Sequence, residues 1–75
     1  MNFKNAALYS LALKAQSDKA EALASLTLLL EHPAGIGDHS TEDFYKNAEE
    51  ALSMLADADD RLEAIERYLN KKEVI

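Results

Sequence analysis

The residues of this chain best suited to hold a metal ion are His32, Asp38 and His39, which lie within eight positions of one another. Imidazole and carboxylate groups are common metal ligands, and two His with one carboxylate form a known open site. Their spacing matches no standard metal motif, so the simpler interpretation is that Asp38 stabilises a turn and both His are solvated. We therefore expect no metal and no other cofactor, and keep a metal site here as an alternative.

The acidic cluster Asp57, Asp59 and Asp60 resembles a calcium site only in composition. A calcium loop needs a Gly at its turn and a bidentate Glu at its end, and both are missing at the required offsets. Spacing of four residues instead predicts the helical ion pairs Asp57–Arg61 and Glu63–Arg67.

Groups that could act as nucleophiles or bases have no suitable neighbours. The chain contains no Cys, and its helical serines have no His at helical spacing to activate them. Lys19 falls on a predicted apolar face, where it could be a catalytic lysine. We expect it instead to pair with Glu50 or Asp57 across a helix interface, or to extend outward. The sequence therefore predicts a protein that is not an enzyme.

The only Pro and both Gly lie between residues 32 and 40, and helix-forming residues flank them on both sides. A residue before proline avoids the α region, so the first helix should end near Glu31. Ser40 reads as the N-cap of the second helix. We predict one all-α domain, 1–75, with helices over about 3–31 and 41–71 and a loop over 32–40.

Apolar residues in the second predicted helix recur at alternating steps of four and three, which is the heptad pattern of coiled-coil packing. They are Phe44, Ala48, Ala51, Leu55, Ala58, Leu62, Ile65 and Leu69. The first helix has a similar seam, interrupted by Lys19: Leu8, Ala12, Ala15, Ala22, Leu26 and Leu29. Leu28 projects to nearly the opposite side, so this helix should face a second partner.

A short loop forces the two helices into an antiparallel hairpin, with Leu30 near Phe44, Ala24 near Ala48 and Leu8 near Ile65. Such a hairpin has no enclosed interior, so we expect a homodimer or higher oligomer that forms a four-helix bundle. The heptad residues of the second helix, with Leu26, Leu28 and Leu29, are the predicted self-association residues.

The net charge of −6, from fourteen acidic and eight basic residues, argues against binding to nucleic acid. The stretch 42–60 is strongly acidic, whereas basic residues gather toward the chain ends. Antiparallel docking of two hairpins would bring these regions together. No apolar run is long enough to span a membrane. We therefore expect a cytoplasmic protein without a membrane partner.

The loop is longer than a hairpin connection requires and is a candidate contact surface. Its contact residues would be His32, Pro33, Gly35, Ile36, Gly37, Asp38 and His39. The segment LLLEHPAGIGDH, with the later LADADDRLEAIERY, resembles a group of small helical proteins encoded by tailed phages, including T4-like phages of marine bacteria. In that group the turn reads N-P-x-G-I-G-D-H, and His32 replaces the usual Asn here. The resemblance covers residues 28–68 and implies a helical hairpin of viral or environmental origin, without an assigned activity.

These features predict a non-enzymatic protein-interaction or structural module, such as a small viral accessory protein acting in the cytoplasm of an infected cell. Its partners would be itself and another protein. One alternative is an RNA- or DNA-binding hairpin dimer, for which only the open end of the hairpin is basic. The other alternative is the metal site at the loop.

Overall fold

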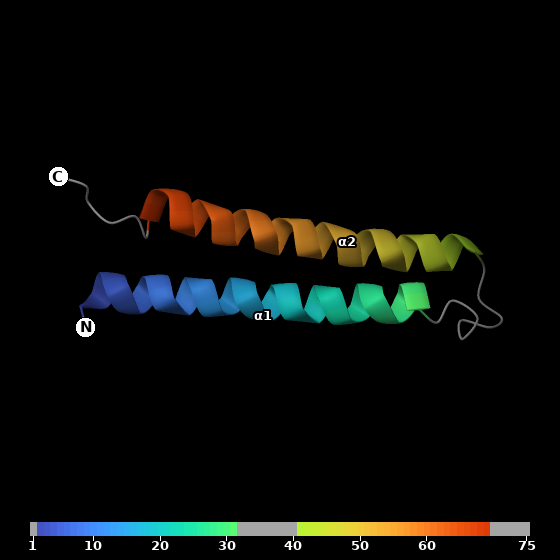
Figure 1. Cartoon of the computed structure of the whole chain (residues 1–75), viewed down its shortest axis with the longest axis horizontal. Helices are drawn as coiled ribbons and strands as arrows, with labels where there is room; N and C mark the ends of the chain where they lie inside the picture. Colours follow the sequence, from blue (N-terminus) through green and yellow to red (C-terminus); the bar gives the residue numbers. More distant parts are fainter. Residues whose placement is uncertain (1, 32–40, 70–75) are drawn as a thin grey trace.

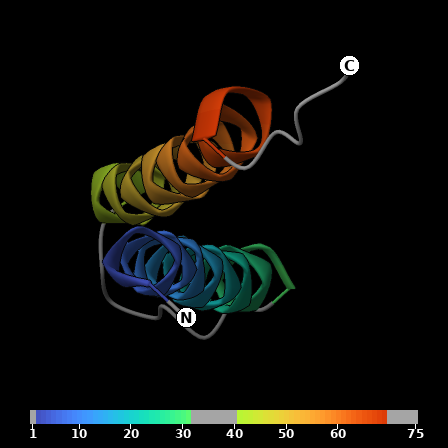
Figure 2. The same ribbon diagram turned by 90° about the vertical axis from the view of Figure 1, so that its left-hand side faces the viewer.

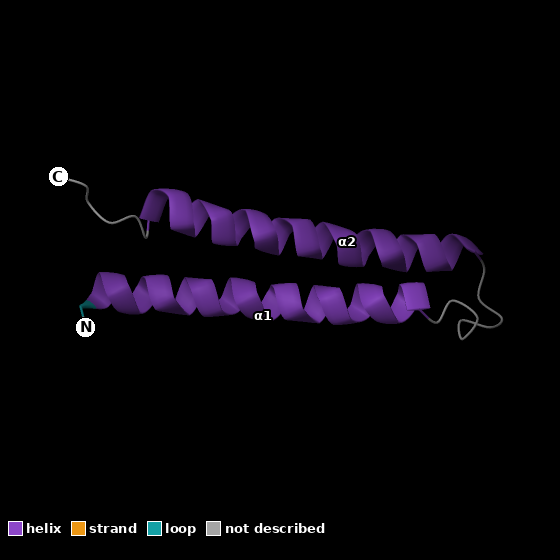
Figure 3. Cartoon of the chain, in the orientation of Figure 1, coloured by secondary structure: helices purple, strands orange, loops and turns teal. Residues whose placement is uncertain are grey.

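A computed structural model describes residues 2–31 and 41–69 of the chain. Two helices and no strand occur in these ranges, so the prediction of an all-α protein is confirmed for the described residues (Figure 3). Helix α1 spans Phe3–Glu31, and helix α2 spans Thr41–Ala64. The last described turn, Ile65–Leu69, is π-helical.

The two helices lie side by side and run in opposite directions (Figures 1 and 2). The start of α1 and the end of α2 therefore share one end of the pair, which we call the open end. Glu31 and Thr41 lie at the other end, called the loop end. The predicted loop, its contact residues and the predicted cap Ser40 lie outside the described residues.

Helix α1 begins with a side-chain cap that the sequence analysis did not identify. The backbone N–H of Asn5 donates to Oδ1 of Asn2 at 2.9 Å, and the N–H of Ala6 donates to the Asn2 carbonyl oxygen at 3.0 Å. Asn is a favoured N-cap because its side-chain oxygen accepts from a backbone donor that has no partner within the helix. The helix then continues to Glu31, the last residue described before the range 32–40.

The interface between the helices is built from alanine. Ala15, Ala22 and Ala58 are completely buried, and Ala51 is 7% exposed. In the described part of the chain no larger side chain is fully buried. Small side chains let two helices approach closely, because the distance between helix axes follows the size of the residues in contact.

Partial burial follows the predicted heptads on both helices. The larger seam residues are half-buried: Leu8, Leu26, Leu29, Phe44, Leu55, Leu62 and Ile65. Leu69, predicted as the last seam residue, is 51% exposed and is not covered by α1 as the other large seam residues are. It lies in the π-helical turn, which closes its hydrogen-bonded rings with one residue more than an α-helix does and so takes the next residues out of heptad phase.

The predicted pairing of facing residues is wrong in part. Ala24 and Leu30 were expected to face Ala48 and Phe44, but both are exposed to solvent. The observed register is marked instead by two ion pairs across the helices, Asp18 with Arg61 and Lys19 with Asp59.

Candidate interaction surface

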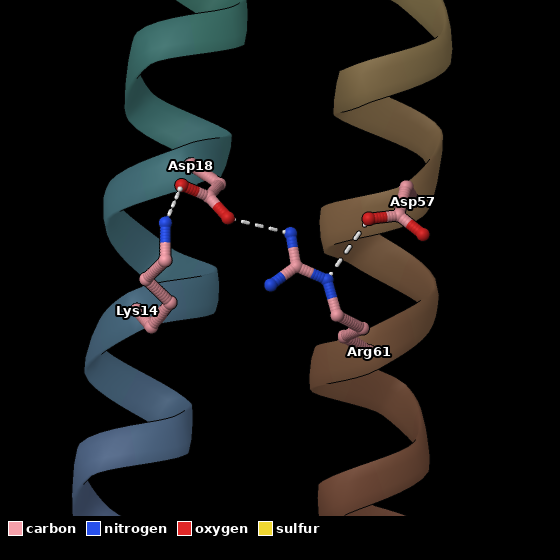
Figure 4. Close-up of polar contacts among 4 residues, drawn as sticks. All are labelled: Lys14, Asp18, Asp57 and Arg61. Atoms are coloured by element: carbon pink, nitrogen blue, oxygen red, sulfur yellow. Dashed lines mark hydrogen bonds and ion pairs between the residues drawn. The ribbon is translucent and has the colours of Figure 1, made fainter.

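An ionic network joins the two helices midway along the pair (Figure 4). The Asp18 carboxylate accepts a hydrogen bond from Nη2 of Arg61 at 2.7 Å and another from Nζ of Lys14 at 3.0 Å. Nε of Arg61 also donates to Asp57 at 3.0 Å. Arg61 therefore connects a carboxylate of α1 to a carboxylate of its own helix, and the contact marks the axial position of one helix relative to the other.

The network holds its two central groups in their charged forms. The hydrogen bond from Arg61, followed by that from Lys14, lowers the pKa of Asp18 below its ordinary value. The bond to Asp18 in turn raises the pKa of Arg61. Only 18% of the Asp18 side chain is exposed, which makes this the least solvated of the ion pairs between described residues. Both shifts lead away from neutral pH, so both groups of the pair are charged at neutral pH.

Lys19 interrupts the apolar seam of α1, but its charged Nζ atom extends out of the seam to a carboxylate. Its Nζ lies 2.9 Å from the Asp59 carboxylate on α2, and both side chains are about half exposed. The ion pair across the interface was predicted in kind, but the predicted partners Glu50 and Asp57 are wrong. The pairs Asp57–Arg61 and Glu63–Arg67, predicted from their spacing, are both confirmed.

Large apolar side chains are exposed on both helices. The described residues include twelve exposed large hydrophobics: Phe3, Tyr9, Leu11, Leu13, Leu23, Leu28, Leu30, Tyr45, Leu52, Met54, Tyr68 and Leu69. Leu28 is 63% exposed, in keeping with its predicted position away from the seam. Most of the other predicted self-association residues, apart from Leu69, are half-buried or buried within the helix pair.

The two long sides of the helix pair differ in character. Asp18 precedes Lys19, which occupies a seam position of α1, and Arg61 precedes Leu62 of the α2 seam. The contact between Asp18 and Arg61 shows that the positions before the seam share one side. We call it the ionic side. Residues that follow a seam residue lie on the other flank of each helix. In an antiparallel pair, these flanks of α1 and α2 meet on the opposite side. At the loop end this opposite side carries Leu23 and Leu30 of α1 with Tyr45 and Leu52 of α2, all exposed.

Next to the seam, α1 carries a second heptad that the sequence analysis missed. We call it the outer stripe. Its residues follow one another at steps of three and four, and all eight are exposed: Ala6, Tyr9, Leu13, Gln16, Ala20, Leu23, Thr27 and Leu30. None of them carries a charge. The spacing was visible in the sequence, but only the structure shows that the first heptad contacts α2 and leaves this one uncovered.

An open groove lies on the ionic side near the loop end. It is lined by Ala22, Ser25, Leu29, Asn47, Glu50, Ala51 and Met54. The groove arises because Ala22 and Ala51 are too small to fill the space beside the interface.

Metal binding receives no support from the part of the chain that the structure describes, where no group of three His, Asp or Glu side chains could hold an ion. The predicted ligands His32, Asp38 and His39 lie outside that part. Within it, Asp57 and Asp59 are engaged with basic side chains.

No helix in the described ranges is long and apolar enough to cross a membrane. No protein family, curated protein or solved structure matches this chain.

Proposed function

We propose that this protein is a non-enzymatic interaction module, in which a helical hairpin self-associates into a four-helix bundle and presents its remaining surface to another protein. One observation carries the proposal. The core consists of four alanines, while twelve large hydrophobic side chains are exposed in the same helices. Apolar surface left on this scale marks a site of association.

The energetics of a short chain support self-association. Small domains bury a small fraction of their surface and are correspondingly marginal in stability. Here the leucines of the seam are only half-buried, so each contributes part of the ~1.5–3 kcal/mol that full burial of such a side chain provides. A second helix pair would cover more of each leucine and raise that contribution.

The non-enzymatic part of the proposal draws on the titration of the described groups. Catalytic acids and bases need a pKa near the working pH. The pKa of Asp18 is lowered and that of Arg61 is raised, and both changes lead away from neutrality. Both groups belong to the network that joins the helices.

The resemblance of the turn H-P-A-G-I-G-D-H to small phage proteins supports the further proposal of a viral accessory role. In that role, residues 32–40 and the acidic outer face of α2 would contact a host or virion protein. Glu49, Asp60 and Glu63 are exposed on that face. A partner with a basic surface would complement it.

Light scattering across a concentration series tests the proposal. We expect a particle of at least twice the chain mass of 8.3 kDa, with a helical circular dichroism spectrum. A helical particle of single-chain mass at every concentration up to the millimolar range would contradict self-association. The exposed apolar surface would then be a site for a different protein.

A further inference from the structure

We propose that the outer stripe of α1 is the surface on which a second copy of this chain docks, with the two α1 helices antiparallel to each other. This inference rests on the self-association proposed above and adds the face, the partner and the orientation. It places the twofold axis near residue 18 of α1.

The stripe has the form of a helix-binding surface. Eight exposed residues at steps of three and four run from Ala6 to Leu30, without a charged member. Another helix with heptad spacing fits such a stripe, because its side chains enter the spaces between successive residues. At the loop end the surface widens onto α2 through Tyr45 and Leu52. The ionic side offers no such continuity, because the network of Asp18 and Arg61 interrupts it. The other ion pair between the helices, Lys19 with Asp59, involves no residue of the outer stripe.

A second copy is favoured because the stripe complements itself when its direction is reversed. With an axis near residue 18, Leu13 lies opposite Leu23 of the other copy. The same operation places Tyr9 opposite Thr27, Gln16 opposite Ala20, and Leu30 opposite Ala6. Three of the four pairs therefore match a larger side chain with a smaller one, which is how packed helices fill space without overlap. An isologous interface between identical chains requires this kind of self-complementarity.

The distribution of charge selects the antiparallel orientation. Residues 19–31 and 41–60 form the loop-end half and contain nine acidic and two basic residues, a net charge of −7. Residues 2–18 and 61–69 form the open-end half and contain four basic and three acidic residues, a net charge of +1. Parallel docking would place two halves of −7 side by side. Antiparallel docking sets each acidic half beside the weakly basic half of its partner.

Site-specific cross-linking tests face and orientation together. The chain has no native Cys, so the single variants Tyr9→Cys and Thr27→Cys each carry one thiol. Antiparallel docking brings position 9 of one copy close to position 27 of the other. Positions 9 and 27 are about 27 Å apart along one helix at ~1.5 Å per residue. A short bis-maleimide linker should therefore join the two variants when they are mixed and should leave each variant alone unlinked.

The other outcomes of this experiment overturn the inference in different ways. Cross-linking within each single variant, without a product specific to the mixture, would show parallel docking. Absence of any cross-link, under conditions where light scattering finds a dimer, would show that another face is used. A wild-type chain that stays monomeric would instead remove the self-association on which the inference rests.

A matched pair of substitutions tests the same face by affinity. Leu23 lies on the stripe and is 44% exposed, whereas Leu28 lies off the stripe and is 63% exposed. Leu23→Gln should raise the dimer dissociation constant roughly tenfold to a hundredfold, because the side chain is used twice in a symmetric dimer. Leu28→Gln should leave the constant within about threefold of wild type. Equal effects of the two substitutions in sedimentation equilibrium, with helicity retained, would overturn the assignment.

Discussion

A leucine at position 58 tests whether the contact between α1 and α2 depends on small side chains. Ala58 is completely buried in the interface between the helices. Leu adds three carbon atoms where no solvent-accessible space exists, so the helices must separate or the side chain must adopt a strained rotamer. Ala56→Leu is the matched control, because Ala56 is exposed on the same helix two residues earlier.

The expected cost follows from overpacking. Forcing extra methylene groups into a packed interface typically costs ~1–3 kcal/mol. A chain of this length has a total unfolding free energy of about 4–11 kcal/mol at ~0.05–0.15 kcal/mol per residue. The loss is therefore a substantial fraction of the whole. At ~4–8 °C per kcal/mol for a domain of this size, Ala58→Leu should lower Tm by roughly 4–24 °C.

Thermal unfolding followed by far-ultraviolet circular dichroism measures this loss, with all proteins at one concentration because association changes Tm. Ala56→Leu should melt within a few degrees of wild type, since Ala and Leu are both strong helix formers. Ala58→Leu should melt well below both. If Ala58→Leu melts together with Ala56→Leu, the interface has room for a larger residue and the alanine contact is not what sets the distance between the helices.

Three further predictions concern the ionic contacts. The stability that Asp18 contributes is present above the pKa of the unfolded carboxyl and is lost as pH falls through the lower folded pKa. The wild-type chain should therefore lose stability below about pH 4. In urea unfolding between pH 2 and 7, Asp18→Asn should show a weaker pH dependence. Arg61→Gln should lower Tm more than Arg67→Gln, because Arg61 joins the two helices, whereas Arg67 contacts Glu63 and the Tyr68 ring, which are its neighbours along the chain. Equal melting temperatures would refute this. Lys19→Met should keep the unfolding free energy, measured by chemical denaturation, within about 1 kcal/mol of wild type. The exposed ion pair that it removes is weak, and the apolar side chain of Met continues the seam. A larger loss would give that ion pair a structural role.

Much of the fold was predictable because local signals agreed with the apolar pattern. Pro33 predicts an end of the first helix near Glu31, and the whole described range from Phe3 to Glu31 is helical. The heptad from Phe44 to Ile65 predicts which side of α2 is covered, and each of its residues is buried or half-buried. Ion pairs at a spacing of four were predicted correctly because both partners lie on one rigid element.

The contacts between the helices were harder to predict. Heptad spacing defines which side of a helix faces its neighbour, but it leaves the axial offset between the helices open. Alanines interlock weakly along the axis, so the offset here is marked by the longer side chains of Asp18 and Arg61. The partner of Lys19 and the facing positions of Ala24 and Leu30 all depend on this offset. The exposure of Leu69 depends on the π-helical turn, which no residue pattern in the chain indicated.

The small core and the apolar exterior have a common cause. A seam whose four buried residues are all alanine lets the helices lie close together, which leaves little volume between them for leucine. The large apolar side chains are consequently placed on the flanks, where Leu13, Leu23 and Leu30 form part of the outer stripe. A helix pair built this way gains close contact along one line but cannot enclose its own leucines. The same composition would fill the interior of a four-helix bundle, because the flanks of each pair then become the surfaces between the layers.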